Sequence, residues 1–191
     1  MTTMTLTLDD INRLAAQLET RPEAFTPIYR QYFSPVYNYA RYRLGDAGAA
    51  DDITAQTFER VLNRIGSFDP QRGTFEAWLF TIARNLVNDH LRRSQRRHWF
   101  SLDAIKERSS DQPGPEQQVI RKQQQAELLA AVARLDEHER DIIALKFASG
   151  FSNRDIAAMT GLSASNVGVI LYRAVKKLKQ TLVSKEDHDN D

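Results

Sequence analysis

The sequence predicts an all-α protein built from two small helical domains that a flexible linker joins. Apolar residues recur at helical spacing in the long segments on both sides of this linker. Between them, residues 99–115 change in composition and end in Pro113-Gly114-Pro115, a run that no regular element would carry. Residues 152–180 then have the capping pattern of two short helices separated by a tight turn.

The composition excludes several classes of protein. With 41% hydrophobic and 27% charged residues, the 191-residue chain has the balance of a globular protein. It has no cysteine, which excludes disulfides and thiolate metal sites, and its four histidines are scattered. We therefore expect no metal, no cofactor and no thiol-based redox sensing. The chain also lacks a P-loop, an HExxH motif and clustered catalytic carboxylates, so we expect no enzyme activity.

Charge and hydropathy point to a cytoplasmic protein with polar surfaces. No apolar run approaches the roughly 20 residues that span a bilayer, and the N-terminus has no basic region before an apolar stretch. We therefore expect no membrane insertion. The net charge of +1 conceals one acidic stretch, residues 46–60, and two basic ones, residues 84–97 and 163–180.

The first domain is expected to span residues 1–97 and to begin with two helices. Thr7 and Asp10 form a possible capping box for the first of them. The second ends near Leu44 and is rich in aromatic residues, which favours packing in the core. The alternating tyrosines and arginines of residues 39–43 are also compatible with a nucleic-acid platform.

A third helix is predicted from Ala49 to Ile65, after a break at residues 45–48. Its apolar residues form one stripe, and acidic and amide side chains lie largely off that stripe. This arrangement predicts an exposed acidic edge, formed by Asp51, Asp52, Gln56 and Glu59.

A loop, residues 67–73, leads into a long helix predicted from Thr74 to Arg97. Arginine and amide side chains repeat along the polar side of this helix, in the rows Arg84, Asn88, Arg92 and Asn85, Asp89, Arg93. Such a face suits single-stranded nucleic acid, because arginines hold phosphates while bases stack or enter pockets. A surface helix with ordinary ion pairs is an equally open interpretation.

The second domain is expected to span residues 116–182, after a linker at 98–115 and before an acidic, disordered tail at 183–191. Its first helix covers residues 116–134, and Asp136 with Glu139 caps the next one.

Residues 152–180 follow the pattern of a helix-turn-helix. Ser152 and Ser163 are N-cap residues, and Gly161 between them can end a helix in the left-handed conformation. The second helix has a buried apolar stripe and a basic face without acidic residues, which suits the phosphate-lined groove of duplex DNA. A solvated face of an ordinary amphipathic helix is the alternative.

Three stretches of the chain resemble bacterial sigma factors of the extracytoplasmic-function class, group 4 of the sigma-70 family. GDAGAADDITAQTFERV resembles region 2.2 of that family, and RGTFEAWLFTIARNLVNDHLRR resembles regions 2.3 and 2.4. LDEHERDIIALKFASGFSNRDIAAMTGLSASNVGVILYRAVKKL resembles region 4. The resemblance implies a region 2 domain and a region 4 domain, and a promoter-specificity subunit without catalytic activity.

The resemblance also implies partners and site residues. The partners would be core RNA polymerase, through the clamp helices of its largest subunit and the flap of its second-largest subunit, promoter DNA both duplex and single-stranded, and an anti-sigma factor. The linker would run toward the RNA exit path. Polymerase contacts are expected from Asp51, Asp52, Gln56 and Phe58. Capture of the unwound −10 strand is expected from Phe68, Arg72, Arg84, Asn85, Asn88 and Arg92. Reading of the −35 element is expected from Ser165, Asn166, Val169, Tyr172, Arg173 and Lys177.

This chain departs from the family at two positions of the last helix. Gly168 and Ile170 stand where the family often has basic residues, which would point at the −35 groove. A stand-alone helix-turn-helix repressor or activator is an alternative function, as is an adaptor that mimics a sigma factor. The acidic helix before a basic, amide-bearing helix favours the sigma factor, because a dimerisation domain does not need that pair.

Overall fold

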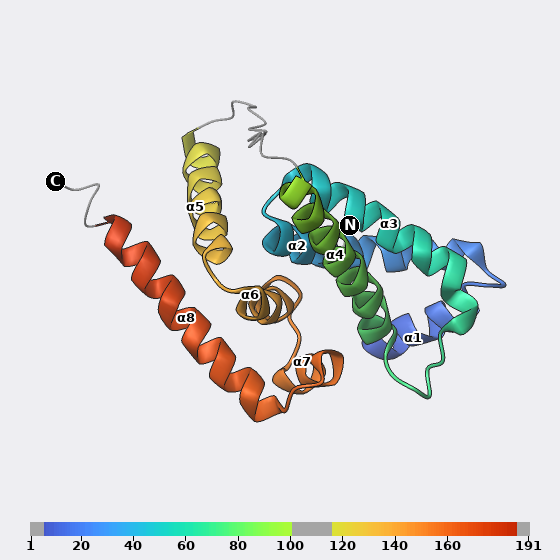
Figure 1. Ribbon diagram of the computed structural model, residues 1–191. Helices are drawn as coiled ribbons and strands as arrows, with labels where there is room; N and C mark the ends of the chain where they lie inside the picture. The colour runs from blue at the N-terminus through green and yellow to red at the C-terminus, as the bar shows by residue number, and fades with distance from the viewer. Residues whose placement is uncertain (1–5, 101–115, 187–191) are drawn as a thin grey trace.

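The chain folds into two groups of helices that pack side by side (Figure 1). The structure is a computed structural model that describes the backbone of residues 6–100 and 116–186 and the side chains of residues 6–96 and 123–183. All regular structure in these residues is helical, so the predicted fold class is confirmed. The first group contains α1 (Leu8–Gln17), α2 (Phe25–Leu44), α3 (Ala47–Arg64) and α4 (Phe75–Phe100), with 3-10 turns at Pro22–Ala24 and Ile65–Ser67. The second contains α5 (Glu116–Ala133), α6 (Glu137–Ile143), a π turn (Ala144–Ala148), α7 (Asn153–Thr160) and α8 (Ala164–Glu186).

Short-range hydrogen bonds define where several helices start and stop. Capping boxes form at the predicted pairs, Thr7 with Asp10, Asp136 with Glu139 and Ser152 with Asp155. Each box satisfies backbone N–H groups that the first turn of a helix leaves without a partner. The helix-turn-helix ends its first helix at Gly161, whose φ of 76° is left-handed and favours glycine.

The limits of the predicted linker and of the predicted tail differ in the structure. Helix α4 continues to Phe100, so it includes three residues assigned to the linker. Helix α8 continues to Glu186, so the start of the predicted disordered tail is helical. The rest of the linker and residues 187–191 lie outside the described residues.

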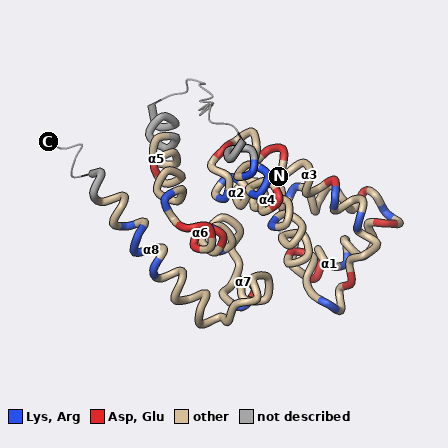
Figure 2. Tube along the Cα trace, viewed as in Figure 1, with Lys and Arg blue, Asp and Glu red and all other residues tan. Residues whose placement is uncertain are grey.

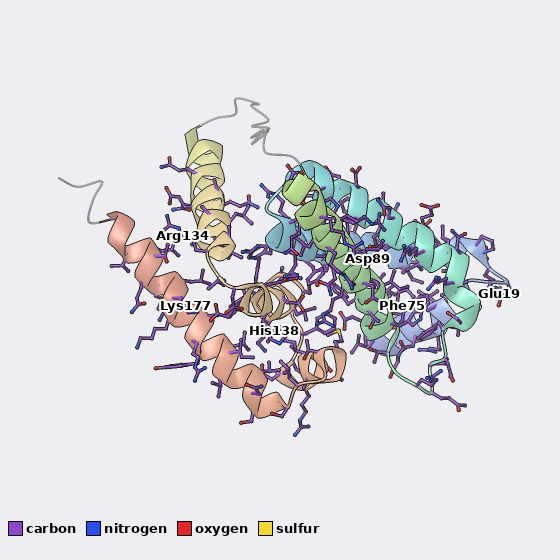
Figure 3. The ribbon with its side chains drawn as sticks, in the orientation of Figure 1. Glu19, Phe75, Asp89, Arg134, His138 and Lys177 are labelled. Carbon is purple, nitrogen blue, oxygen red and sulfur yellow. The ribbon has the colours of Figure 1, made fainter. Side chains whose placement is uncertain are left out.

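The apolar cores of the two groups merge. Phe75 and Leu79 of α4 are fully buried within the first group, where Figure 3 shows Phe75 among the packed side chains. Phe80 lies on another side of α4, and its ring meets that of Phe151 edge-on at 4.8 Å between centroids. Phe151 precedes α7, so this aromatic pair joins the two groups. The sequence predicted two domains but not this interface between them.

Candidate nucleic-acid interface

A pocket opens between the α3–α4 loop, the first turns of α4 and the end of α7. It encloses about 420 Å³ and is lined by Phe68, Arg72 and Trp78, among others. Phe68 packs edge-on against Phe75 at 5.5 Å and lies 5.6 Å from the ring of Trp78. These contacts hold the aromatic wall in place without a ligand. A preformed aromatic pocket beside an exposed arginine can stack and enclose a base that has left its duplex.

The exposed face of α4 continues from this pocket toward the end of the helix. Thr81 lines the pocket, and Asn85 lies one turn further along α4 and is exposed. Arg92 is exposed on the same helix and pairs with Asp89, with 3.1 Å between Nη2 and Oδ1. Asn85 and Arg92 are therefore accessible to a strand that leaves the pocket along α4.

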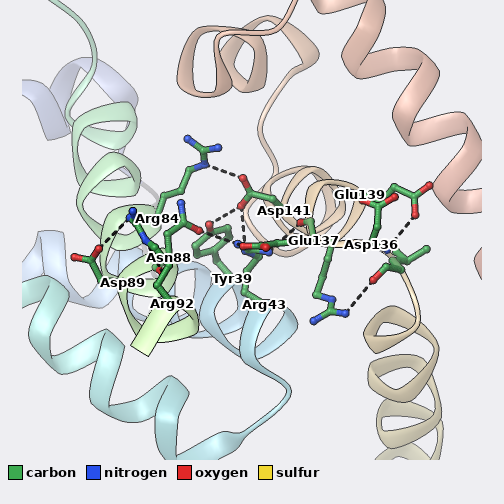
Figure 4. A network of polar contacts seen from close by, with 12 residues as sticks. Tyr39, Arg43, Arg84, Asn88, Asp89, Arg92, Asp136, Glu137, Glu139 and Asp141 are labelled. Carbon is green, nitrogen blue, oxygen red and sulfur yellow. Dashed lines mark hydrogen bonds and ion pairs between the residues drawn. The ribbon is translucent and has the colours of Figure 1, made fainter. Parts of the chain in front are cut away.

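Two other residues of the predicted α4 rows are held by contacts with neighbouring elements (Figure 4). The Arg84 guanidinium donates from Nε to Asp141 Oδ2 at 2.7 Å and from Nη1 to the Met159 carbonyl at 3.0 Å. Asn88 accepts a hydrogen bond from Arg43 Nη2 at 2.8 Å. Arg84 and Asn88 thus lie on the predicted face, but Arg84 is occupied by the second domain and Asn88 by Arg43.

Asp141 on α6 is the centre of the polar contacts between the two domains. Tyr39 donates its hydroxyl proton to Asp141 Oδ1 at 2.7 Å. Arg43 Nε forms an ion pair with the same oxygen at 3.2 Å, and Arg43 Nη1 donates to the Glu137 carbonyl at 3.1 Å. Burial and the nearby Asp141 carboxylate raise the pKa of Tyr39 well above its usual value, so its hydroxyl remains protonated as a donor.

The helix α8 presents a basic, partly apolar surface away from the first domain, and Figure 2 shows its basic residues gathered in the middle of the helix. Tyr172 is 73% exposed and Val169 45% exposed. Helical spacing places the following exposed residues on one face: Ser165, Asn166, Val169, Tyr172 and Arg173.

Lys177 is tied to the neighbouring helix. Its ammonium group lies 2.6 Å from the Glu139 carboxylate of α6, which is almost buried, while the lysine side chain is 55% exposed. Figure 3 shows Lys177 reaching from α8 toward α6. A lysine used in this way contributes to the packing of α6 on α8 as well as to the charge of the exposed face.

Three sequence-based expectations change in the structure. Ile170 is half-buried against the core, so its position does not project freely into a groove. Gly168 packs beside α7, where an added Cβ would lie 3.6 Å from Asn153 Nδ2. Phe58 is 3% exposed and packs against Tyr29, with 4.7 Å between ring centroids. Phe58 therefore supports the acidic edge from inside rather than facing a partner.

The acidic edge itself is present on α3. Asp51, Asp52, Gln56 and Glu59 are all exposed. Gln56 lies about one helical turn after Asp52, and Glu59 about one turn after Gln56. The four residues therefore form a continuous strip on the outer side of the helix. The exposed carboxylates of Asp51, Asp52 and Glu59 can face a basic partner surface.

The residues that join the two domains were not predicted from the sequence. Tyr39 and Arg43 were considered only for helix packing or for a nucleic-acid platform, Asp141 was assigned no role, and Trp78 and Thr81 were not assigned to the pocket. Phe80 and Val87 carried a signal, because they are apolar yet lie beside the stripe that Phe75, Leu79, Ile82 and Leu86 form at helical spacing. Asp141 carried another, as a carboxylate next to the apolar residues 142–145.

Glu76 on α4 makes the contact with α7 sensitive to pH. Burial and the repulsion of Asp155 on α7 raise the pKa of Glu76 above its usual 4.5. A raised pKa of an acid means that the folded protein loses stability as pH rises through that pKa. We expect Glu76→Gln to unfold at a higher temperature than the unsubstituted chain at neutral pH, with the difference disappearing below pH 4.5. Thermal unfolding followed by circular dichroism measures this, and an equal difference at both pH values would contradict it.

Comparison with known proteins identifies the family. Residues 28–97 match the model of "Sigma-70 region 2" and residues 125–178 match that of "Sigma-70, region 4". The chain is 38% identical over 160 residues to the ECF RNA polymerase sigma factor BldN of Streptomyces coelicolor, covering 84% of this chain and 61% of BldN. It is 34% identical over 139 residues to the RNA polymerase sigma factor CnrH of Cupriavidus metallidurans, covering 69% of this chain and 72% of CnrH. The chain therefore belongs to the sigma-70 family, in its extracytoplasmic-function class of RNA polymerase sigma factors.

Members of this class are non-enzymatic subunits of RNA polymerase that direct promoter-specific transcription initiation, which is the function class expected from the sequence. The chain spans about three fifths of the length of BldN. Among solved structures, CnrH in complex with the cytosolic domain of CnrY matches with a TM-score of 0.70 and 26% identity, over 92% of this chain and 99% of that one. The sigma factor RpoE of Bartonella quintana, in complex with the anti-sigma factor NepR, shares the fold with a TM-score of 0.65 and 22% identity, over 84% of this chain and 97% of that one.

Two further findings concern the described residues alone. None of the helices among them is both long and apolar enough to cross a bilayer. The same residues contain no cluster of histidine, aspartate and glutamate side chains that could hold a metal ion.

Proposed function

We propose that this chain docks on core RNA polymerase through α3, captures an unwound −10 strand on α4 and reads a −35 duplex with α8. The observation that carries the proposal is the pocket of Phe68, Arg72 and Trp78, with the exposed Asn85 one helical turn beyond the pocket residue Thr81 on α4. A dimerisation domain has no use for an aromatic pocket beside an amide-bearing helix. A single strand needs both, because bases stack on aromatic rings while polar side chains read their edges.

The polymerase contact is assigned to the acidic edge of α3. Asp51, Asp52 and Gln56 are exposed there, and the family places its contact with the clamp helices of the largest subunit at these positions. The second domain would meet the flap of the second-largest subunit, and the linker would run toward the RNA exit path. Region 2 would occupy residues 1–97 and region 4 residues 116–182.

The −35 contact is assigned to the exposed face of α8. We expect Arg173→Ala to weaken binding of upstream duplex DNA by the polymerase holoenzyme. If Arg173 contacts a phosphate, the loss reduces the slope of log affinity against log salt by about one unit. If it contacts a base edge, the loss costs about 1–3 kcal/mol at one base pair only. Salt titration with wild-type and single-base-substituted duplexes measures both, and binding unchanged in all of them would remove Arg173 from the site.

A partner that regulates the chain is a further part of the proposal. The solved structure of CnrH contains the cytosolic domain of CnrY, so a sigma factor similar to this chain forms a complex with a second protein. This chain has no cysteine with which to sense oxidation itself. An anti-sigma factor would therefore carry the signal to it.

In vitro transcription with core RNA polymerase and genomic DNA tests the proposed function directly. We expect the purified chain to direct initiation from a defined set of promoters, whose shared upstream sequences reveal the −35 and −10 elements. Tight binding to duplex operators without polymerase, together with no transcription in the presence of core enzyme, would instead identify a stand-alone regulator.

A further inference from the structure

The second domain covers the part of α4 that the proposed function assigns to the −10 strand. Asp141 of α6 and the Met159 carbonyl of α7 together occupy the guanidinium of Arg84. We infer that this arrangement is a closed form of the free chain, in which Asp141 takes the place of a phosphate of the promoter strand. The strand and the second domain then compete for one surface. This inference rests on the proposed function of α4.

The chemistry of the contact supports a substitution of this kind. A guanidinium binds carboxylate and phosphate oxygens with the same N–H donors. Asp141 Oδ2 lies 2.7 Å from Arg84 Nε, and the arginine side chain is 23% exposed. A phosphate cannot use the Nε donor of Arg84 while the carboxylate is bound to it.

The closed form also limits access to the base pocket. Ala158 and Met159 of α7 complete the lining to which Phe68 and Trp78 contribute. Asn88 is tied to the second domain indirectly. The Arg43 guanidinium donates to Asn88, and the same guanidinium also contacts Asp141 and the Glu137 carbonyl of α6. Asn85 remains exposed, so the closed form withdraws part of the site and leaves an entry point for a strand.

The charges at this contact make it reversible. The carboxylate of Asp141, 6% exposed, serves both Arg43, which is 1% exposed, and Arg84. Glu137 adds a weaker partner, 3.7 Å from Arg43 and largely exposed. Without the Asp141 carboxylate, two guanidinium groups would face each other with little solvent, and separating the domains would hydrate both of them. Loss of this one charge should therefore open the chain.

The experiment compares Asp141→Asn with Glu23→Gln in the full chain. Glu23 is exposed on the 3-10 turn after α1, so its substitution removes one negative charge without touching α4 or the second domain. Because the chain has no cysteine, Asn63→Cys on α3 and Lys179→Cys on α8, both exposed, can carry a donor and an acceptor dye. Energy transfer between the dyes reports closure. Fluorescence anisotropy with random-sequence single-stranded oligonucleotides of about 12 nucleotides reports strand binding.

We expect Asp141→Asn to lower energy transfer and to tighten oligonucleotide binding about tenfold relative to Glu23→Gln, since apparent affinity scales with the fraction of open chain. Added oligonucleotide should lower energy transfer in the unsubstituted chain as well. Unchanged energy transfer in Asp141→Asn would overturn the closed form. Lower energy transfer without tighter binding would overturn the competition.

A third substitution separates the inference from the proposed function. Asn85→Ala in the Asp141→Asn background should weaken oligonucleotide binding. If binding is not weakened, the assignment of the strand site to α4 is wrong, and so is the competition inferred from it. Unchanged energy transfer in Asp141→Asn refutes the closed form alone and leaves the strand site untouched.

Arg43→Gln makes the same test from the first domain if Asp141→Asn does not fold. It removes the partner of Asp141 and Asn88 while leaving Arg84 available to a strand. The expected result is again lower energy transfer and tighter binding. Full energy transfer in a folded Arg43→Gln chain would overturn the inference.

Discussion

Reversing Asp51 and Asp52 to lysine together is expected to abolish association with core RNA polymerase. The two carboxylates are exposed on α3, so the reversal changes the charge of the docking surface without disturbing the core. Two repulsive contacts in place of two attractive ones should weaken binding at least about 100-fold. Co-purification with core enzyme and competition against an unsubstituted chain measure the effect.

A matched double reversal provides the control. Glu19 and Glu23 are also exposed on the first domain, and Glu19 lies beside Gly66, at the opposite end of α3 from Asp51. Glu19→Lys combined with Glu23→Lys should retain association, although it changes the net charge by the same amount. Equal loss in both variants would show that overall charge, and not the α3 edge, controls docking.

Replacing Asn85 with alanine is expected to impair promoter opening far more than binding to closed duplex. Asn85 is exposed on α4, one turn beyond the pocket of Phe68 and Trp78, where a base that leaves the duplex would reach it. Loss of a polar contact to a base edge costs about 1–3 kcal/mol, which corresponds to roughly a 5- to 160-fold loss of open complex. Permanganate footprinting of promoter DNA in the presence of holoenzyme measures the opening.

A template with a preformed bubble distinguishes the two causes of such a defect. If Asn85 only helped to separate the strands, the bubble would restore activity to Asn85→Ala. Because we expect it to hold a displaced base, the defect should persist on the bubble. Thr20→Ala, at an exposed position between α1 and the following 3-10 turn, is a control of the same domain that should open promoters normally.

Local features of the fold could be predicted from the sequence because they depend on residues close together in the chain. The capping boxes at Thr7, Asp136 and Ser152 each involve residues three positions apart, and all three were predicted. The exposure of Asp51 and Tyr172 followed from helical periodicity in the same way. Residues on the outer side of a helix are identified once the apolar stripe is known.

The contacts between domains could not be predicted because no local pattern encodes them. Asp141 and Arg84 are 57 positions apart, and Tyr39 and Asp141 are 102 apart. Each of these residues is consistent on its own with a solvated surface position. For Phe58 the local pattern and the family resemblance gave different predictions. Its place on the apolar stripe of α3 indicated burial, whereas the resemblance indicated contact with a partner. The structure places Phe58 in the core.

The capping boxes of α6 and α7 also determine what kind of motion can separate the two domains. Asp136 with Glu139 and Ser152 with Asp155 stabilise the first turns of these helices using only side chains of the second domain. The start of α8 likewise uses Ser163, which accepts from the Asn166 N–H at 3.1 Å, so the three helices of this domain whose first turns have described side chains all begin on its own residues. The second domain can therefore leave α4 as a rigid body, on the microsecond to millisecond timescale of hinge movements, without the slower steps of local unfolding and refolding.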